Sequence, residues 1–162
     1  MIQDEKSELK KSLSGDLGVS IVWLRRDLRL TDNAALYHAL RGPYPVLPLF
    51  IFDKNILDKL ESKDDARVTF IHRTISELEE KLAAQKCALL VKYDTPEQAW
   101  AAVLKEYNVK AVYTNHDYEP YAKERDDALA EFLRSEEITF HSFKDQVIFE
   151  KDEVVKADGK PY

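Results

Sequence analysis

A doubly wound α/β fold, a five-stranded parallel sheet with helices on both faces, is predicted by three features of the sequence. Five short apolar runs occur along the chain, and they are rich in the β-branched and aromatic residues that strands prefer. Between them lie segments with apolar residues at spacings of three and four, which is typical of amphipathic helices. Strands that alternate with helices in this way favour right-handed crossovers and a parallel sheet. We therefore expect a Rossmann-like core over residues 19–149.

The predicted strands are short apolar runs bounded by charged or turn-forming residues. One of them carries Pro48, and a proline inside a strand normally indicates an edge or a bulge because it lacks a pairing N–H. We still predict a strand there, since its neighbours are all apolar. The five strands are expected at residues 19–24, 45–52, 87–93, 110–115 and 138–143.

The predicted helices carry start and stop signals. Thr31 or Asp32 can cap a first helix that ends before Gly42, and we expect its apolar residues, Leu40 among them, to face the core. Three further helices are expected: over residues 68–82, after the cap Thr95 with Pro96 at the first helical position, and from Pro120 onward.

Composition limits the class of protein. The 162 residues, 44% of them apolar, suit one domain, and no apolar run is long enough to cross a bilayer, so we expect a soluble, cytoplasmic protein without membrane contact. The net charge is −6, whereas proteins that bind nucleic-acid phosphates usually have a basic surface, so any nucleic-acid role is expected to reside largely outside this segment. The single cysteine, Cys87, excludes a disulfide framework and is expected to be a small buried residue. The four histidines lack ligand spacing, so we expect no metal site.

The two ends of the chain differ from the middle. Residues 1–18 are polar and contain a glycine-bearing break, so we expect a flexible N-terminal tail. After Phe149 the chain becomes charged, and residues 150–162 read as the start of a connection to another domain.

Chemically interesting residues follow the predicted strands. The carboxyl ends of parallel strands lie at one edge of the sheet, and ligands bind there where the strand order reverses. Arg25, Arg26 and Asp27 follow the first strand, whereas Asp117 and Glu119 follow the fourth. If the order reverses between these two strands, the arginines and the acidic pair flank one crevice. Such carboxylates beside aromatic residues would suit a planar heterocycle with exchangeable N–H groups.

Structural roles for the same residues remain open. Arg25, Arg26, Asp27 and Arg29 could form a salt-bridged turn that ties the strand to its helix. Asp117 and Glu119 could act only as charges at a helix N-terminus. Phe50 and Phe52 could simply pack in the core, and Asp53 could be a turn former.

Motifs of several catalytic classes are missing. The sequence contains no G-x-S-x-G, G-x-x-x-x-G-K-[ST], G-x-G-x-x-G or H-E-x-x-H motif, and four glycines leave little room for a phosphate-binding loop. No nucleophile is paired with a base, so we expect no catalytic residue in this segment.

The stretch VWLRRDLRLTDNAAL at 22–36 resembles the opening signature of the DNA photolyase/cryptochrome family. Segments 46–53, 66–82 and 112–126 resemble that family in order and spacing, the last through an Asn-x-Asp-x-Glu-Pro-Tyr motif. The signature residues of the first segment are Arg25, Arg26, Asp27, Arg29, Asp32 and Asn33.

The resemblance implies a class I deoxyribodipyrimidine photolyase whose N-terminal α/β domain holds a light-harvesting antenna chromophore. A helical domain, expected to be absent from this fragment, would bind FAD and damaged DNA and would repair cyclobutane pyrimidine dimers. The implied antenna-binding residues are Phe50, Phe52, Asp53, Asp117 and Glu119.

The resemblance also favours one kind of antenna. Members with a folate antenna carry an Asn-Glu pair where this chain has Tyr121 and Ala122, so a deazaflavin or FMN is expected in place of folate. Two other readings remain: the N-terminal domain of a cryptochrome blue-light receptor, which signals through partners, and an unrelated nucleotide-binding α/β module. The isolated domain is expected to be monomeric.

Overall fold

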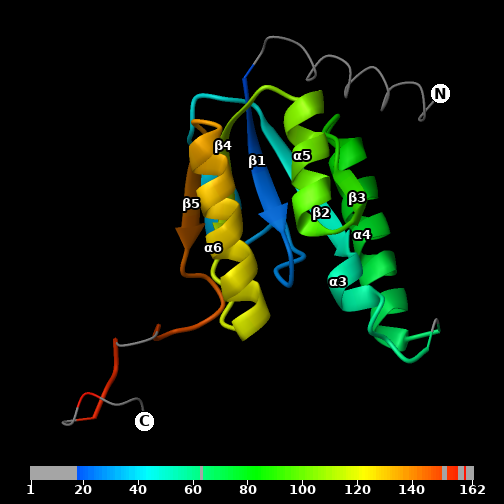
Figure 1. Cartoon of the computed structure of the whole chain (residues 1–162). Coiled ribbons are helices and arrows are strands. Elements are labelled where there is room, and N and C mark those ends of the chain that lie inside the picture. The colour runs from blue at the N-terminus through cyan, green and yellow to red at the C-terminus, as the bar shows by residue number, and fades with distance from the viewer. Residues whose placement is uncertain (1–17, 63, 151–152, 157–158, 160–162) are drawn as a thin grey trace.

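The computed structural model describes residues 18–62, 64–150, 153–156 and 159. Its centre is a five-stranded parallel sheet in the order β3-β2-β1-β4-β5, built from β1 (Val19–Leu24), β2 (Val46–Asp53), β3 (Leu90–Asp94), β4 (Val109–Asn115) and β5 (Thr139–Phe143). The chain first builds outward through β2 and β3 and then returns to add β4 beside β1 (Figure 1). This confirms the predicted doubly wound fold and places the reversal of strand order between β1 and β4.

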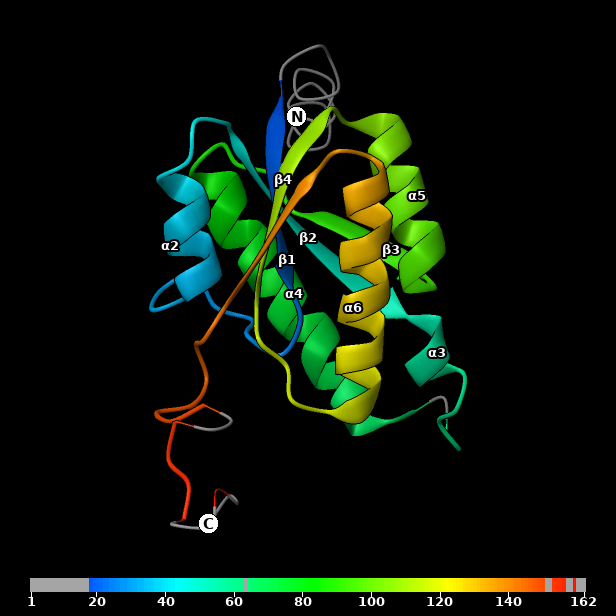
Figure 2. The ribbon, with the colours of Figure 1, turned by 60° about the vertical axis from the view of Figure 1, so that its left-hand side comes forward.

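Helices cover both faces of the sheet, as Figure 2 shows. On one face α5 (Pro96–Glu106) and α6 (Pro120–Ser135) bury Trp100, Val103 and Leu133 against residues such as Ile21 and Leu49. On the opposite face lie α2 (Ala34–Leu40) and α4 (Ala66–Ala84), whose buried residues are Ala35, Ala39, Ile75, Leu78 and Leu82. Because β1 and β2 have a helical layer on both sides, their residues are almost continuously apolar.

Most helices begin after a residue whose side chain accepts a hydrogen bond from a free backbone N–H group of the first turn, whereas α6 has no such bond. Asp65 and Thr95 accept hydrogen bonds from the backbone N–H groups of Arg67 and Gln98, and Pro96 occupies the first position of α5 as predicted. Pro120 likewise opens α6. A helix that the sequence did not predict, α3 (Lys54–Leu57), follows directly from β2.

Pro48 lies within β2, in register with Val22 of β1. Pairing of β2 with β3 begins only at Leu49, so β2 has a neighbour on one side at the proline. The strand prediction was therefore correct. Although β2 is an interior strand, at Pro48 it pairs with β1 alone, so the proline lies at a local edge of the sheet.

The first helix differs from its prediction. Neither Thr31 nor Asp32 caps it: Asp32 has a φ of 53°, whereas Asn33 has the extended backbone of a cap and accepts from the Leu36 N–H at 3.0 Å. The buried face of α2 is formed by Ala35 and Ala39, which lie one turn apart, so Leu40 falls beside this face and is 65% exposed.

Cys87 also differs from its prediction. It is exposed, because β3 begins at Leu90 and leaves Cys87 in the turn after α4. The expected N-terminal tail falls almost wholly on residues outside the described part of the chain, and the boundary of the expected connection stays a prediction. No described helix has the length and apolar character needed to cross a membrane.

Two leucines test the assignment of core and surface. Leu49 is fully buried in β2, so Leu49→Ala should lower the free energy of unfolding by about 2–5 kcal/mol through lost burial and a cavity. Leu40→Ala should change it by no more than about 0.5 kcal/mol because Leu40 faces solvent. Urea-induced unfolding measures both values, and equal losses would contradict this core assignment.

Candidate functional site at the carboxyl edge of the sheet

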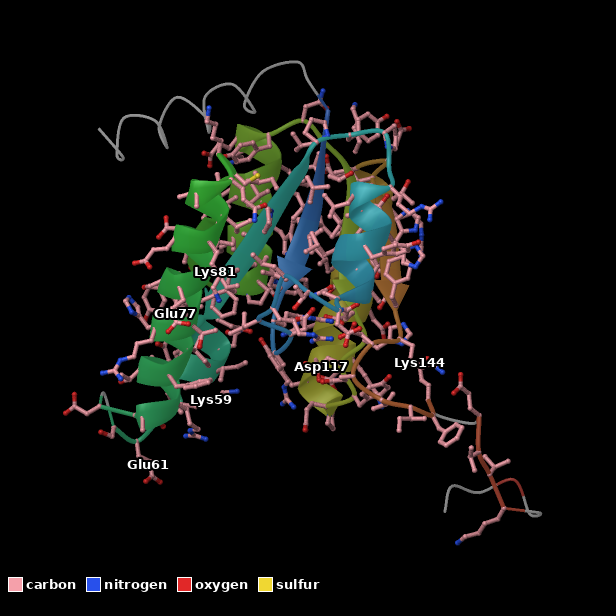
Figure 3. All side chains as sticks on the ribbon, turned by 180° about the vertical axis from the view of Figure 1, so that it is seen from behind. Lys59, Glu61, Glu77, Lys81, Asp117 and Lys144 are labelled. Atoms are coloured by element: carbon pink, nitrogen blue, oxygen red, sulfur yellow. The ribbon has the colours of Figure 1, made fainter. Side chains whose placement is uncertain are left out.

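A cavity of about 450 Å³ opens where β1 and β2 end and α6 begins, and we call it the edge cavity. Its volume is in the range of pockets that hold small organic ligands. Figure 3 places Asp117, one of its residues, beyond the strand ends. The lining residues are Trp23, Arg25, Arg26, Phe50, Ile51, Phe52, Asp53, Ile56, Leu57, Leu60, Arg67, Val68, Ile71, Asp117, Glu119, Tyr121, Ala122 and Arg125.

The edge cavity brings together the five residues that the sequence singled out for ligand binding. They come from two segments far apart in sequence: Phe50, Phe52 and Asp53 from β2, and Asp117 and Glu119 from the connection between β4 and α6. The rings of Phe50 and Phe52 meet edge to face with centroids 4.9 Å apart, and Phe50 also belongs to the core beneath. Packing and cavity lining are therefore combined in the same aromatic pair.

The apolar wall of the edge cavity comes from α3 and α4. Val68 and Ile71 precede the buried residues of α4 at helical spacing and border the cavity. Ile56 and Leu57 of α3 line it as well. The unpredicted helix α3 thus supplies part of one side of the site.

A polar network behind the cavity joins β4 to the turn after β1. The Asn115 side-chain amide donates to Asp27 Oδ2 at 2.6 Å and to Asn33 Oδ1 at 3.0 Å, while its oxygen accepts from the Ala35 N–H at 2.9 Å. Asp27 also accepts from the Arg25 N–H at 2.8 Å. Asp27 and Asn33 are thereby occupied in fixing the turn and do not line the edge cavity.

Two of the three arginines are also held by partners within the fold. Arg25 bonds the Asp126 carboxylate and the Asn115 carbonyl. Arg29 pairs with Asp145, whose carboxylate is 4% exposed and also accepts from the Ala34 N–H at 2.9 Å. These contacts tie the turn after β1 to α6 and to the segment after β5.

Arg26 differs from the other two. Its side chain is 62% exposed, and its guanidinium lies 3.7 Å from Asp117 and 3.6 Å from Glu119, at the mouth of the edge cavity. Contacts of this length made by an exposed side chain are weak. An incoming ligand could therefore displace Arg26 from these carboxylates at low cost.

Asp53 has two roles at the base of the cavity. It caps α3 by accepting from the Asn55 N–H at 2.9 Å, and its other oxygen accepts from the Tyr121 hydroxyl at 2.6 Å. Burial, reinforced by this bond to Asp53, raises the pKa of the Tyr121 phenol to about 12. At neutral pH the pair is thus a neutral phenol donating to a carboxylate.

Most of the other lining residues were not predicted from the sequence, and three of them carry polar or aromatic groups that matter for the site: Trp23, Tyr121 and Arg125. Tyr121 and Arg125 are four residues apart and therefore lie on one face of α6. The helix start predicted at Pro120, together with this spacing, could have indicated both residues. Trp23 lies in β1, two positions before Arg25, which directly follows the strand, and strand alternation could have indicated that both side chains point to one side.

The described residues contain no cluster of three or more potential metal ligands. The edge cavity instead combines apolar walls with a few carboxylates and guanidinium groups, an arrangement that suits a planar, polar-edged organic ligand.

The fold belongs to the general class of α/β domains that bind ligands beyond their strand ends, near the reversal of strand order. Residues 20–162 match the family model described as DNA photolyase. The chain belongs to the DNA photolyase family and corresponds to the N-terminal domain of its members.

Curated relatives include both photolyases and cryptochromes. A deoxyribodipyrimidine photo-lyase of Synechococcus is 30% identical over 142 residues, which are 88% of this chain and 29% of that protein. Cryptochrome-1 of Arabidopsis thaliana is 30% identical over 151 residues, 91% of this chain and 22% of that protein. The chain thus spans less than a third of the length of these two relatives.

Solved structures agree with the sequence relatives. A class III photolyase of Agrobacterium tumefaciens superposes with a TM-score of 0.78 at 29% identity, covering 92% of this chain and 30% of the other. An archaeal photolyase of Sulfolobus tokodaii with two FAD molecules gives 0.73 at 28% identity, with 83% and 32% covered.

Alanine variants should distinguish the structural Arg29 from the loosely held Arg26 by their effect on the free energy of unfolding. Arg29→Ala should lower the free energy of unfolding by about 1–3 kcal/mol, because the buried Asp145 carboxylate loses its charged partner. Arg26→Ala should change it by less than about 0.5 kcal/mol, since the Arg26 side chain is mostly exposed and both of its contacts are longer than a hydrogen bond. Chemical unfolding of both variants tests this, and an Arg29→Ala protein as stable as the wild type would refute the structural role.

The Tyr121 phenol gives a pH test. Its pKa in the folded protein, about 12, exceeds the value of 10.0 expected without the fold, so its stabilising effect is full below pH 10 and is lost as the pH rises toward 12. The difference in tyrosinate absorbance between wild type and Tyr121→Phe should therefore titrate near 12, with circular dichroism reporting the folded state. A midpoint near 10 would show that the phenol is not held as described.

Proposed function

We propose that this chain is the antenna-binding domain of a photolyase and that the edge cavity holds the antenna chromophore. The observation that carries the proposal is the convergence of Phe50, Phe52, Asp53, Asp117 and Glu119 on one cavity. Aromatic and aliphatic walls can enclose the faces of a planar ring system, and carboxylates at the edge can accept its N–H groups.

A flavin-type ring, FMN or a deazaflavin, is the proposed ligand. Tyr121 and Ala122 stand where folate-binding relatives are expected to carry an Asn-Glu pair. The Tyr121 hydroxyl is already bonded to Asp53, and Ala122 is only 2% exposed, so neither offers the side-chain amide or carboxylate of that pair. Asp117 and Glu119 remain as the acceptors: Glu119 is exposed, and Asp117, although largely buried, lines the edge cavity and is held only by long contacts to Arg26 and to the Glu119 N–H.

We propose that the excitation gathered here serves repair of cyclobutane pyrimidine dimers in DNA by FAD. The chemistry would take place outside this chain: the chain spans 29% of its Synechococcus photolyase relative, and its net charge of −6 argues against an extensive DNA-binding surface of its own. In the complete protein the activity would be that of a deoxyribodipyrimidine photo-lyase.

A cryptochrome function is the second candidate. It is favoured by the identity to Arabidopsis cryptochrome-1, 30%, which equals that to the Synechococcus photolyase. A light-driven repair assay on the protein that contains the FAD-binding part separates the two, because a signalling cryptochrome would leave the dimers intact.

Ligand binding can be measured on this chain. FMN, a deazaflavin and a reduced folate are added in turn, and equilibrium dialysis with absorption spectra is used to detect the bound chromophore. FMN or the deazaflavin should bind at micromolar concentration, and the folate should bind more weakly.

Variants at the acidic pair locate the binding. Asp117→Asn and Glu119→Gln should each weaken flavin binding by roughly tenfold, about 1.4 kcal/mol, without unfolding the domain. Glu124→Gln is the matched control, since this exposed carboxylate of α6 lies outside the edge cavity. Equal affinities for all three variants and the wild type would refute the site.

A further inference from the structure

Trp23 is the aromatic side chain of the edge cavity with two guanidinium groups over its ring. The Arg25 Cζ lies 5.1 Å and the Arg125 Cζ 4.7 Å from the ring centroid. Trp23 is only 2% exposed, and all three side chains border the edge cavity. The indole therefore lies at the wall of the proposed chromophore site, next to two nearly buried cations.

An indole at this place poses a chemical problem for an antenna. A photoexcited flavin is a strong one-electron oxidant, and tryptophan is among the most easily oxidised side chains. One electron would pass from Trp23 to the excited ring, giving an indole radical cation and a flavin radical anion. Its return would restore both groups and release the excitation as heat, so no energy could be passed on.

The two arginines oppose that electron transfer. The radical cation of Trp23 would carry a positive charge beside the two existing ones, and like charges at this separation in a poorly solvated site repel strongly. Asp126 is the carboxylate that both guanidinium groups contact, Arg25 at 2.6 Å and Arg125 at 3.0 Å. Two cations share one anion, so the group retains one net positive charge next to the ring.

The other carboxylates of the edge cavity outnumber the cations that they contact, but they lie at its mouth and base, whereas the two guanidinium groups lie over the indole ring itself. Asp117 and Glu119, at the mouth, are paired with Arg26. Asp53 lies at the base, where it is held by Tyr121 and Asn55. The cation–π contacts also favour the ground-state ring, whose electrons attract the guanidinium groups, over the oxidised ring, which lacks one of those electrons.

We propose that Arg125, together with Arg25, protects the excited state of the chromophore by making Trp23 a poor electron donor. This inference rests on the proposed antenna function and adds a photophysical role to Arg125 and to Arg25, the second of which also ties the turn after β1 to α6. Arg125 is a positioning and tuning residue in this role.

Fluorescence lifetime tests the proposal with FMN as the probe. At saturating FMN, Arg125→Met should shorten the lifetime of the bound flavin several-fold, whereas Arg125→Lys, which keeps the charge, should stay close to wild type. Adding Trp23→Phe to Arg125→Met should restore the long lifetime, since the electron donor is then gone. An unchanged lifetime in Arg125→Met, or shortening that persists without Trp23, would overturn the proposal.

A second measurement needs no ligand. The chain has two tryptophans, so Trp100→Phe leaves Trp23 as the single indole. Its oxidation by azide radicals, followed by the absorbance of the tryptophan radical after pulse radiolysis, should become several-fold faster with Arg125→Met and remain slow with Arg125→Lys. Equal rates in all three proteins would overturn the proposal. If FMN fails to bind, the antenna function fails, and this comparison still decides the role of Arg125.

Discussion

The amide of Asn115 is the constraint on which the site depends. It lies at the end of β4, is 3% exposed, and bonds Asp27 and Asn33 of the turn after β1 and the Ala35 N–H in the first turn of α2. A buried amide has few other ways to satisfy its hydrogen-bonding groups, so the end of β4 and the turn after β1 must stay together. That junction is the reversal of strand order, and it fixes the two loops that carry Arg26 and the Asp117/Glu119 pair.

The arginine-rich turn has two separate tasks as a result. Arg25 pairs with Asp126 of α6, and Arg29 pairs with Asp145 after β5, so both arginines hold the turn in place. Arg26 lies at the cavity mouth and only loosely neutralises the acidic pair. The residues with strong internal partners thus build the frame, and those with weak partners remain able to meet a ligand. Three guanidinium groups after a strand accordingly need not indicate a phosphate site.

Much of the fold follows from the sequence because its signals are local. The alternation of buried strands with amphipathic helices and the cap at Thr95 depend on neighbouring residues, and the structure confirms them. The convergence of the five cavity residues also follows from a general rule, since the carboxyl ends of parallel strands share one edge. Other features depend on where a helix or strand begins, and residue propensities do not fix such boundaries to within one or two residues. These features are the cap at Asn33, the exposure of Leu40 and Cys87, and helix α3.

The pairings at the base of the site required the structure. These contacts join residues from different elements and depend on how α6 is placed against β1 and β2. They are the bond between Tyr121 and Asp53 and the contacts of Trp23 with Arg25 and Arg125. A crystal structure of the chain with FMN would test the central claim most directly. The flavin ring should lie in the edge cavity, with its N–H edge within hydrogen-bonding distance of Asp117 or Glu119. A flavin seated elsewhere, for example in the smaller pocket between α5 and α6, would contradict it.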